Sequence, residues 1–421
     1  MAEPDPAEPE RAQLAAEIAH WRNAVDALAD LDTIAAPAAW AGLEEYLRMR
    51  VRDRLAAVVA DLSLEAARCS TALSRGDDTG AVRRAVLALR RRYLQVETIL
   101  DFYGDAVGSR TNPALAAVLS GLDVIAGDSL DVILGRVGIA TPPAVVYLDK
   151  GLGAAILRAD VRLWDRTSPS PVAAIKLTRH NLSYPTAILH ECGHQVGHLT
   201  GWNAELADAL ALALAPRSRE LAEAWRSWAS ELAADVHAFA LAGWAPLPAL
   251  ANVVDGGTAA VYQAVPGDPH PFPWIRVIVN AALCRSWFGA GPWDGLAVAW
   301  ARRHPPERAP SEIAGLARLS VDALDDIVRV CTRQPMAAFG GRPLSAVADP
   351  ARRSPEALDA LARRAGPSLL TSQYLARREP LAVLAWLAIR PVADPANGAA
   401  HRRDLLDWLA RLSPGAPARA A

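Results

Sequence analysis

The spacing of apolar residues along the first 135 positions is that of amphipathic helices. Apolar side chains recur every three or four residues in Gln13–Leu31 and in Ala38–Leu73, with Ala, Leu, Glu and Arg between them. This is the period of one face of an α-helix. Thr79–Tyr103 repeats the pattern, and Asp77-Asp78-Thr79 supplies an N-cap at its start. A shorter pair of helices is expected between Asn112 and Val137.

The next part of the chain has the pattern of β-strands. Ala144–Leu148 is a compact β-prone run, and Ala154–Trp164 alternates between apolar and polar positions. Val172–Thr178 is a third strand-like segment, and turn-forming Gly, Pro and Ser residues separate the three. The pattern therefore predicts a small antiparallel sheet in the middle of the chain.

Helical spacing returns near Pro185, a residue suited to the first turn of a helix. After Gly201 the pattern stays helical to the end of the chain, interrupted by loops rich in Pro and Gly. The sequence therefore predicts a mainly α fold of the α+β class, with regions at 1–140, 141–300 and 301–421. Four short amphipathic helices are expected near the end: Val321–Arg333, Ser354–Ala365, Pro380–Ile389 and His401–Leu412.

The composition is that of a folded protein without general affinity for polyanions. Hydrophobic residues make up 52% and charged residues 21% of the 421 residues, and the formal net charge is −2. Such a balance gives no electrostatic attraction to nucleic acid, so we expect none as a partner. The most apolar stretches, Leu206–Ala215 and Pro380–Ile389, are half the length that a membrane-spanning helix needs, so no span is expected.

The start of the chain and its cysteines indicate a cytoplasmic protein. The first residues are acidic and lack the basic and apolar regions of a secretory signal. The four cysteines are scattered and form no CxxC pair, which is typical of free thiols in a reducing compartment. Export by a route without a cleaved signal stays open.

One short segment carries the pattern of a metal site: Leu189-His190-Glu191-Cys192-Gly193-His194-Gln195-Val196-Gly197-His198. On a helix, His190 and His194 lie on the same face, about 6 Å apart at the backbone. Two neutral imidazoles at this separation can bind one Zn²⁺ at about 2.0–2.1 Å. Glu191 follows the first histidine, where a carboxylate can hold a zinc-activated water and take its proton.

A catalytic zinc site needs one further protein ligand and an open position for water. Glu231 and Asp235 lie one turn apart on a predicted helix. We expect Glu231 to complete the site, and Asp235 to accept a hydrogen bond from a ligand histidine and so orient it. Asp235 is the alternative third ligand if Glu231 does not bind.

Other interpretations of the motif are open. With nine histidines in the chain, the His-Glu-x-x-His pattern arises by chance in roughly one chain in a hundred. His198 would lie about 12 Å from His190 along an unbroken helix, too far to share one ion. A metzincin protease has a third histidine six residues after the second, and here that position is Thr200. Cys192 points away from the histidine face and is expected to pack.

The order of these motifs resembles that of gluzincin metallopeptidases, in which His-Glu-x-x-His is followed by a glutamate ligand on a later helix. Glu231-Leu232-Ala233-Ala234-Asp235 is similar to their Glu-x-x-Ala-Asp segment. Asp268–Arg276 is similar to the His-Pro…Arg segment of CaaX-prenyl-protease and HtpX-like zinc endopeptidases. The resemblance covers about 100 residues, from Pro185 to Val279. Those relatives are membrane proteases, so their substrates are not carried over.

The resemblance implies a zincin-like catalytic domain with a small sheet and an active-site helix. It implies that Glu191 is the general base and that His270 donates to the oxyanion formed when water attacks a carbonyl. Arg276 would bind a substrate carbonyl or carboxylate, or anchor the His270 loop. In such enzymes the substrate pairs with an edge strand before the metal helix, a place that Val172–Thr178 occupies here.

We therefore expect a zinc-dependent metallopeptidase that hydrolyses a peptide or protein substrate. One alternative is a helical interaction protein in which zinc is only a structural ligand. Another is an exported toxin protease that uses the same site. A structural site has no use for a carboxylate at Glu191, so that residue discriminates the enzyme from the interaction protein. The pattern predicts neither the substrate sequence nor the oligomeric state.

Overall fold

The computed structural model of the protein describes residues 8–265 and 267–413. It is mainly helical, with 73% of residues in helices, and contains a three-stranded mixed sheet and a two-stranded sheet. The mainly α prediction is confirmed. The internal contacts divide the chain into two compact units. The first comprises residues up to 117 together with 157–174, and the second comprises 118–156 together with 175 onward.

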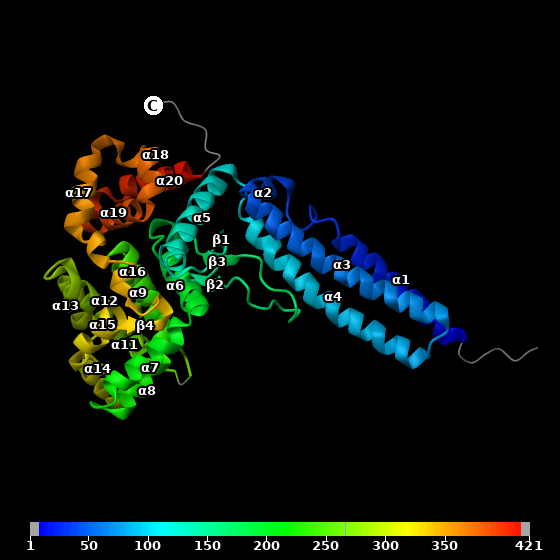
Figure 1. The fold of residues 1–421 in the computed structure, drawn as a ribbon, viewed down its shortest axis with the longest axis horizontal. Helices are drawn as coiled ribbons and strands as arrows, with labels where there is room; N and C mark the ends of the chain where they lie inside the picture. The colour runs from blue at the N-terminus through cyan, green and yellow to red at the C-terminus, as the bar shows by residue number, and fades with distance from the viewer. Residues whose placement is uncertain (1–7, 266, 414–421) are drawn as a thin grey trace, which may run out of the picture. The chain divides into compact units, whose positions relative to one another are not determined.

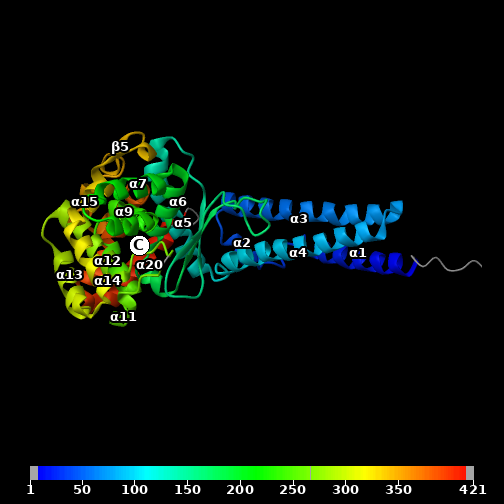
Figure 2. The same ribbon diagram turned by 90° about the horizontal axis from the view of Figure 1, so that it is seen from below.

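Three long helices form most of the first unit: α1 (Glu8–Leu28), α3 (Glu45–Arg75) and α4 (Thr79–Gly108). They run side by side in both views of the chain (Figures 1 and 2). Their buried faces repeat every three or four residues, as the sequence predicts. The predicted N-cap is confirmed, because the Asp78 carboxylate accepts a hydrogen bond from the Ala81 amide at 2.8 Å.

The second predicted helix is interrupted at its start. The short helix α2 (Pro37–Ala41) ends at Gly42, and α3 begins three residues later. A side chain at position 42 would bring its Cβ to 2.9 Å from the Cβ of Arg110. Glycine therefore allows the chain to turn close to the residues that follow α4.

The predicted strand Ala154–Trp164 is wrong beyond its first residues. Only β2 (Ala155–Leu157) is a strand, and the chain then forms a loop. Asp160 and Arg166 adopt left-handed backbone angles, with φ of 63° and 61°. Such angles are uncommon for residues other than glycine and are incompatible with an extended strand. Apolar and polar residues alternate in this segment, but its backbone does not adopt the extended conformation that such alternation predicts.

The three-stranded sheet has the order β1–β3–β2, with β1 at Ala144–Leu148 and β3 at Ala173–Leu177. The sheet is mixed, whereas the sequence predicts an antiparallel one. The prediction is therefore wrong for the direction of one strand. The prediction that Val172–Thr178 is an edge strand is also wrong, because β3 lies between the other two. Both of its edges are hydrogen-bonded within the sheet, so a substrate strand cannot add beside it.

The segment from Asn112 to Val137 is one helix rather than the predicted pair. Helix α5 (Pro113–Leu134) is continuous and ends in a 3₁₀ turn at Gly135–Val137. No residue within it breaks the helical hydrogen bonds as a proline would. Its residues from 118 onward belong to the second unit.

Helix α9 (Ala229–Ala242) is the centre of the second unit. All of its residues except Ser230 are buried. Helices α6 (Ala187–Thr200), α7 (Trp202–Leu214), α12 (Pro273–Phe288), α15 (Leu324–Arg333) and α19 (Pro380–Ala393) pack against it. A helix that is buried on every side is expected to be apolar all round. Its acidic residues and its histidine therefore need a specific explanation.

The helices predicted near the end of the chain are confirmed as α15, α17 (Pro355–Ala365), α19 and α20 (Gly398–Leu412). Regions 141–300 and 301–421 lie in one unit, apart from residues 157–174. The remaining helices are α8 (Arg219–Ser227), α10 (Pro246–Val254), α11 (Thr258–Val261), α13 (Pro292–Arg303), α14 (Ser311–Asp322), α16 (Leu344–Val347) and α18 (Gln373–Arg378). The remaining strands are β4 (Pro335–Met336) and β5 (Arg342–Pro343), an antiparallel pair. Short 3₁₀ turns lie at His180–Ser183, Pro306–Arg308, Ala337–Phe339, Pro350–Arg353, Gly366–Leu370 and Pro395–Asn397.

Within the described ranges, no helix is both long enough and apolar enough to cross a membrane. All four cysteines are buried and unbridged, as their scattered spacing predicts. The prediction about a secretory signal rests partly on residues 1–7, which lie outside the described residues.

Candidate metal centre

Helices α6 and α9 cross closely because Gly193 lies at their contact. A Cβ on Gly193 would lie 2.6 Å from the Cα of Ala234 and 3.0 Å from the carbonyl oxygen of the same residue. These distances leave no room for a side chain. Glycine in the middle of α6 therefore lets the helix that carries His190 and His194 approach the helix that carries Glu231.

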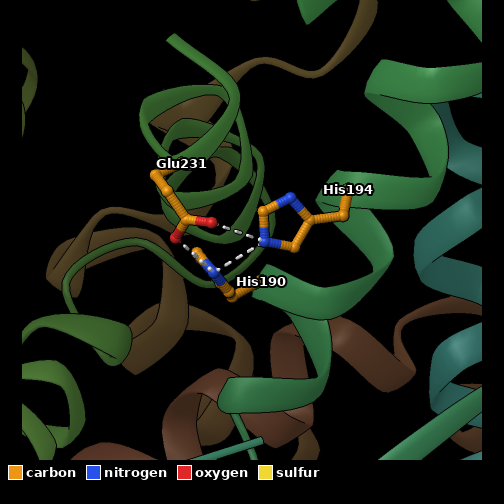
Figure 3. Close-up of side chains that lie close together, drawn as sticks. All are labelled: His190, His194 and Glu231. Carbon is orange, nitrogen blue, oxygen red and sulfur yellow. Dashed lines mark hydrogen bonds and ion pairs between the residues drawn. The ribbon is translucent and has the colours of Figure 1, made fainter. Parts of the chain in front are cut away.

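The three predicted metal ligands meet at this crossing (Figure 3). The Nε2 atoms of His190 and His194 are 3.2 Å apart. Glu231 Oε2 lies 3.4 Å from His190 Nε2, and Glu231 Oε1 lies 3.3 Å from His194 Nε2. These residues form a group that could hold a metal ion.

The separations match those between the donor atoms of a tetrahedral zinc site. With metal–ligand bonds of about 2.0–2.1 Å, neighbouring donor atoms in a tetrahedron lie about 3.3–3.4 Å apart. The separation of the two Nε2 atoms agrees with this value within about 0.2 Å, and each Nε2 lies at a similar separation from one oxygen of Glu231, His190 from Oε2 and His194 from Oε1. Two imidazoles and a carboxylate are also a donor set that zinc binds in catalytic sites.

Glu231 is a buried carboxylate that lies against His190, His194 and Arg276. Its Oε2 atom is buried and accepts no hydrogen bond from any residue that the structure describes. Its contacts with His190 and with Arg276 Nη2, the latter at 3.2 Å, are ion-pair contacts only. Burial raises the pKa of Glu231, but its contacts with both histidines and the charge of Arg276 outweigh it and hold the pKa far below its usual range. A metal cation at this place would satisfy the lone pairs of Oε2 that accept no hydrogen bond.

Asp235 lies one turn after Glu231 and orients the first histidine. Its Oδ1 atom is 2.8 Å from His190 Nδ1, so the outer nitrogen of the ring donates and Nε2 faces the ligand group. Asp235 therefore makes the contact that the sequence predicts with one of the two histidines of the motif. Burial disfavours a charge on His190, but Asp235 and Glu231 outweigh this effect and raise its pKa to about 10. A metal therefore has to displace a proton from this ring.

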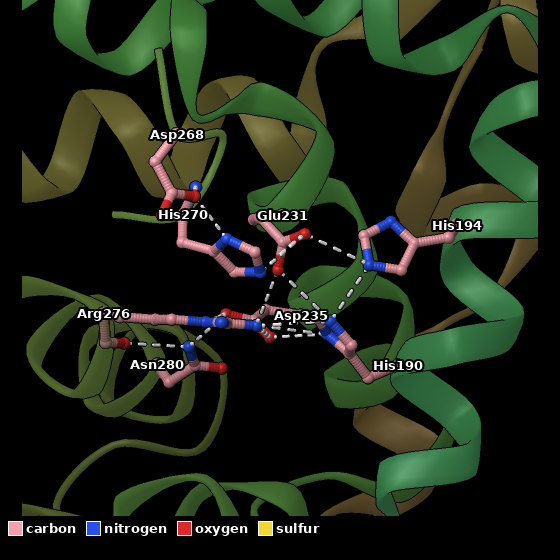
Figure 4. A network of polar contacts seen from close by, with 8 residues as sticks. All are labelled: His190, His194, Glu231, Asp235, Asp268, His270, Arg276 and Asn280. Carbon is pink, nitrogen blue, oxygen red and sulfur yellow. Dashed lines mark hydrogen bonds and ion pairs between the residues drawn. The ribbon is translucent and has the colours of Figure 1, made fainter. Parts of the chain in front are cut away.

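Arg276 and Asn280 of α12 hold Asp235 in place (Figure 4). Arg276 donates to both oxygens of Asp235 at 2.8 Å, and it is only 8% exposed. Asn280 donates to Asp235 Oδ2 at 3.1 Å and to the Arg276 carbonyl at 2.9 Å. The sequence pattern assigns no role to Asn280, which lies one helical turn after Arg276 on the same helix.

Glu191 is buried beside the ligand group, with 6% of its surface exposed. Burial raises the pKa of its carboxyl group, whereas charges on His190 and His194 lower it and Glu231 raises it further. A carboxylate whose proton affinity is raised is suited to accept a proton from water near neutral pH.

His270 approaches the group from the loop before α12. Its Nε2 atom is 3.4 Å from Glu231 Oε1, and its side chain is 54% exposed. Asp268 accepts hydrogen bonds from the amide of His270, at 2.9 Å, and from its ring Nδ1. The sequence assigned no role to Asp268, which orients the His270 ring so that Nε2 points toward Glu231 (Figure 4).

Two further predictions concern α6. His198 is exposed near the end of the helix and does not belong to the group of metal-ligand atoms. The Cys192 thiol is fully buried, donates to the Ala126 carbonyl at 3.6 Å, and has its pKa raised by burial to about 12. A thiol in this state packs and is not a nucleophile, as predicted.

Comparisons with protein-family models, with curated proteins and with solved structures gave no match. The interpretation of the site therefore depends on its own geometry.

Proposed function

We propose that the protein is a zinc-dependent metallohydrolase that cleaves peptide bonds. The observation that carries the proposal is the set of three separations, 3.2, 3.3 and 3.4 Å, between His190, His194 and Glu231. The second support is the buried Glu191 beside them. Zinc is the proposed metal because two imidazoles and one carboxylate are typical of its catalytic sites. The resemblance to gluzincins in the order of the motifs supports the same function.

Bound zinc supplies Lewis acidity, which polarises a carbonyl group and makes a water molecule a nucleophile near neutral pH. Glu191 accepts the proton of the attacking water and delivers it to the leaving amine. A positioned acid–base group of this kind contributes roughly 10²–10⁴-fold to the rate. With both ring nitrogens protonated, His270 donates through Nδ1 to Asp268 and through Nε2 to the oxyanion, and Asp268 keeps the ring in the orientation that this requires.

Asp235, Arg276 and Asn280 keep the ligands in place. Asp235 fixes the orientation of His190, and the two α12 side chains fix Asp235. Such outer contacts typically change metal affinity or activity by about 10–100-fold. We assign Arg276 to this positioning role because its Nε and Nη2 groups contact Asp235. Substrate binding by Arg276 stays a prediction.

The test replaces Glu191 by Gln, which keeps the size of the side chain and removes its basicity. We expect zinc content to stay as in the wild type and hydrolysis of a diverse peptide library to fall by roughly 10²–10⁴-fold. The matched control is His198→Ala, a histidine on the same helix outside the ligand group, which should keep both zinc and hydrolysis.

The same experiment separates the enzyme from a helical interaction protein with a structural zinc. A wild-type protein that holds zinc but cleaves no member of the library would support the interaction protein. Equal hydrolysis by the wild type and by Glu191→Gln would contradict the assigned role of Glu191.

A further inference from the structure

A cavity of about 330 Å³ lies in the second unit at the C-terminal end of α9. Ala240 and Leu241 contribute to its wall, nine and ten residues after Glu231. At 1.5 Å per residue, this places it about 14 Å along the helix from the ligand carboxylate. The other walls come from α5, from the segment Val347–Arg353 and from α18 and the start of α19. The cavity is therefore separate from the metal centre.

One wall of the cavity is rich in arginine. Arg352, Arg353, Arg377 and Arg378 line it, together with the carboxylates of Asp349 and Glu379. Arg352 and Arg353 are ion-paired with Glu379 at 3.6 and 3.7 Å, and Arg353 also donates to the Leu241 carbonyl at 2.9 Å. Arg377 and Arg378 are exposed and form no ion pair with any residue in the described ranges. The guanidinium groups of Arg377 and Arg378 are therefore the ones available to an anionic group, which they bind well.

The start of α19 lies in the same wall. Pro380 is its first residue and Leu381 its second, and both line the cavity. The side chain of Glu379 does not cap the helix. The positive end of the α19 dipole therefore adds to the attraction for an anion.

Another part of the lining is acidic. Asp128 and Asp131 lie one turn apart on α5 and both line the cavity. Burial, and then the charge of Asp131, raise the pKa of Asp128 to about 6. Arg136 also lies on this wall, but it donates a hydrogen bond to the Val347 carbonyl. Carboxylates that destabilise one another in this way favour a cation beside them and disfavour a second anion.

We propose that this cavity binds a small dipolar molecule, with its carboxylate against Arg377 and Arg378 and its amine against Asp128 and Asp131. A free amino acid or a short peptide has both groups. The volume equals that of about ten water molecules, which suits a molecule of this size. The acidic wall argues against a compact polyanion such as phosphate. The proposal does not depend on the metal centre or on its chemistry.

The probe is triglycine, which has an amine at one end and a carboxylate at the other. Its N-acetylated form lacks the cation, its C-terminal amide lacks the anion, and inorganic phosphate is the simple anion. Binding is measured by calorimetry on the full chain carrying Glu191→Gln, so that the probe is not consumed if the metal centre is hydrolytic. We expect triglycine to bind at least roughly tenfold more tightly than either blocked form or phosphate, since each lacks one charged contact.

The variant Arg377→Glu/Arg378→Glu should lose triglycine binding by roughly tenfold or more. The matched control is Arg363→Glu/Arg364→Glu, an exposed arginine pair on α17 that does not line the cavity, and it should bind as the parent does. Circular dichroism of all three proteins checks that each is folded, and Arg377→Gln/Arg378→Gln serves if the charge reversal is not. Absence of triglycine binding, equal binding of the blocked forms or of phosphate, or full binding by the cavity variant would overturn the proposal.

Discussion

The helix pair α3–α4 and the helix pair α6–α9 are built on different principles. The residues that α3 and α4 bury are apolar or small, and they recur at helical spacing, while the charged residues lie outside. Helix α9 is buried on almost every side and yet contains Glu231, Asp235 and His237. Helix α6 contributes the buried Glu191 and Gln195. Burial of apolar area explains the first pair, but it cannot explain the second.

Buried charges destabilise a fold unless they are paired and hydrogen-bonded. The carboxylates of α9 are paired with His190, His194 and Arg276, around a place where the ligand atoms could hold a metal ion. His237 is fully buried, and burial lowers its pKa to about 3, so it is neutral and contacts Ser129 at 3.0 Å. The comparison teaches that the α6–α9 pair keeps polar residues that stability alone would disfavour, as expected of a functional site.

The largest effect is expected from removing a buried partner. Asp235→Ala removes both hydrogen bonds from the buried Arg276 to Asp235, leaving its contact with Glu231, and removes the carboxylate that faces His190 Nδ1. We expect the free energy of unfolding to fall by about 3–5 kcal/mol and zinc affinity to fall by about 10–100-fold. A urea titration and a competition assay with a zinc chelator measure the two quantities. A loss of less than about 1 kcal/mol would show that the network is not stabilising.

The next effect tests the close crossing of the second pair. Gly193→Ala places a Cβ against the Ala234 backbone, so α6 and α9 must separate. We expect the free energy of unfolding to fall by about 1–3 kcal/mol, together with weaker zinc binding. The control is Gly315→Ala in α14, where a Cβ meets nothing within 4 Å. There alanine should stabilise the helix by up to about 1 kcal/mol, and equal effects at the two positions would contradict the close crossing.

The third prediction concerns a polar centre in the first unit. Asp165 accepts hydrogen bonds from the amides of Thr167 and Ser168, at 3.1 and 2.9 Å, and from both hydroxyl groups, and it pairs with Arg92. Burial raises its pKa, but these contacts outweigh it and lower the pKa below the usual value. We expect Asp165→Asn to reduce the free energy of unfolding by about 1–2 kcal/mol at neutral pH.

The sign of the pH dependence follows from the lowered pKa of Asp165. Its contribution is present above the pKa of the unfolded state, about 3.9, and is lost as the pH falls through the lower pKa of the folded state. The difference between the wild type and Asp165→Asn should therefore shrink below about pH 4. Urea titrations at neutral and acidic pH measure it, and a difference that grows in acid would contradict the assignment.

The smallest effect is expected from an exposed pair in the first unit. Asp32 lies 2.7 Å from Arg52, and both side chains are at least one-third exposed. Asp32→Ala should change the free energy of unfolding by less than about 1 kcal/mol, because water screens the pair. A loss as large as that of Asp235→Ala would remove the contrast between the two regions.

The parts of the fold that depend on local sequence could be predicted. The spacing of apolar residues predicts the long helices, and Asp78 predicts where one of them begins. The same four-residue spacing placed His190 and His194 on one face. The strand order β1–β3–β2 depends on long-range pairing, and the loop after Leu157 depends on the left-handed backbone of Asp160 and Arg166. The alternation of apolar and polar residues indicates neither.

The site was predictable where residue type indicates the chemistry. Glu231 and Asp235 were found because carboxylates one turn apart suit a ligand and its partner. Asn280 was missed because an amide that joins Asp235 to the Arg276 carbonyl has no pattern of its own until α9 and α12 are packed together. The close crossing at Gly193 was also not predicted, since a glycine within a helix does not by itself indicate what it contacts.

The measurement that tests the central claim most directly is the metal content of the purified protein by mass spectrometry. We expect one zinc ion per chain in the wild type and in His198→Ala, and none in His194→Ala or Glu231→Ala. A wild type that binds no zinc when supplied with it, or a Glu231→Ala variant that retains the full amount, would contradict a site formed by His190, His194 and Glu231.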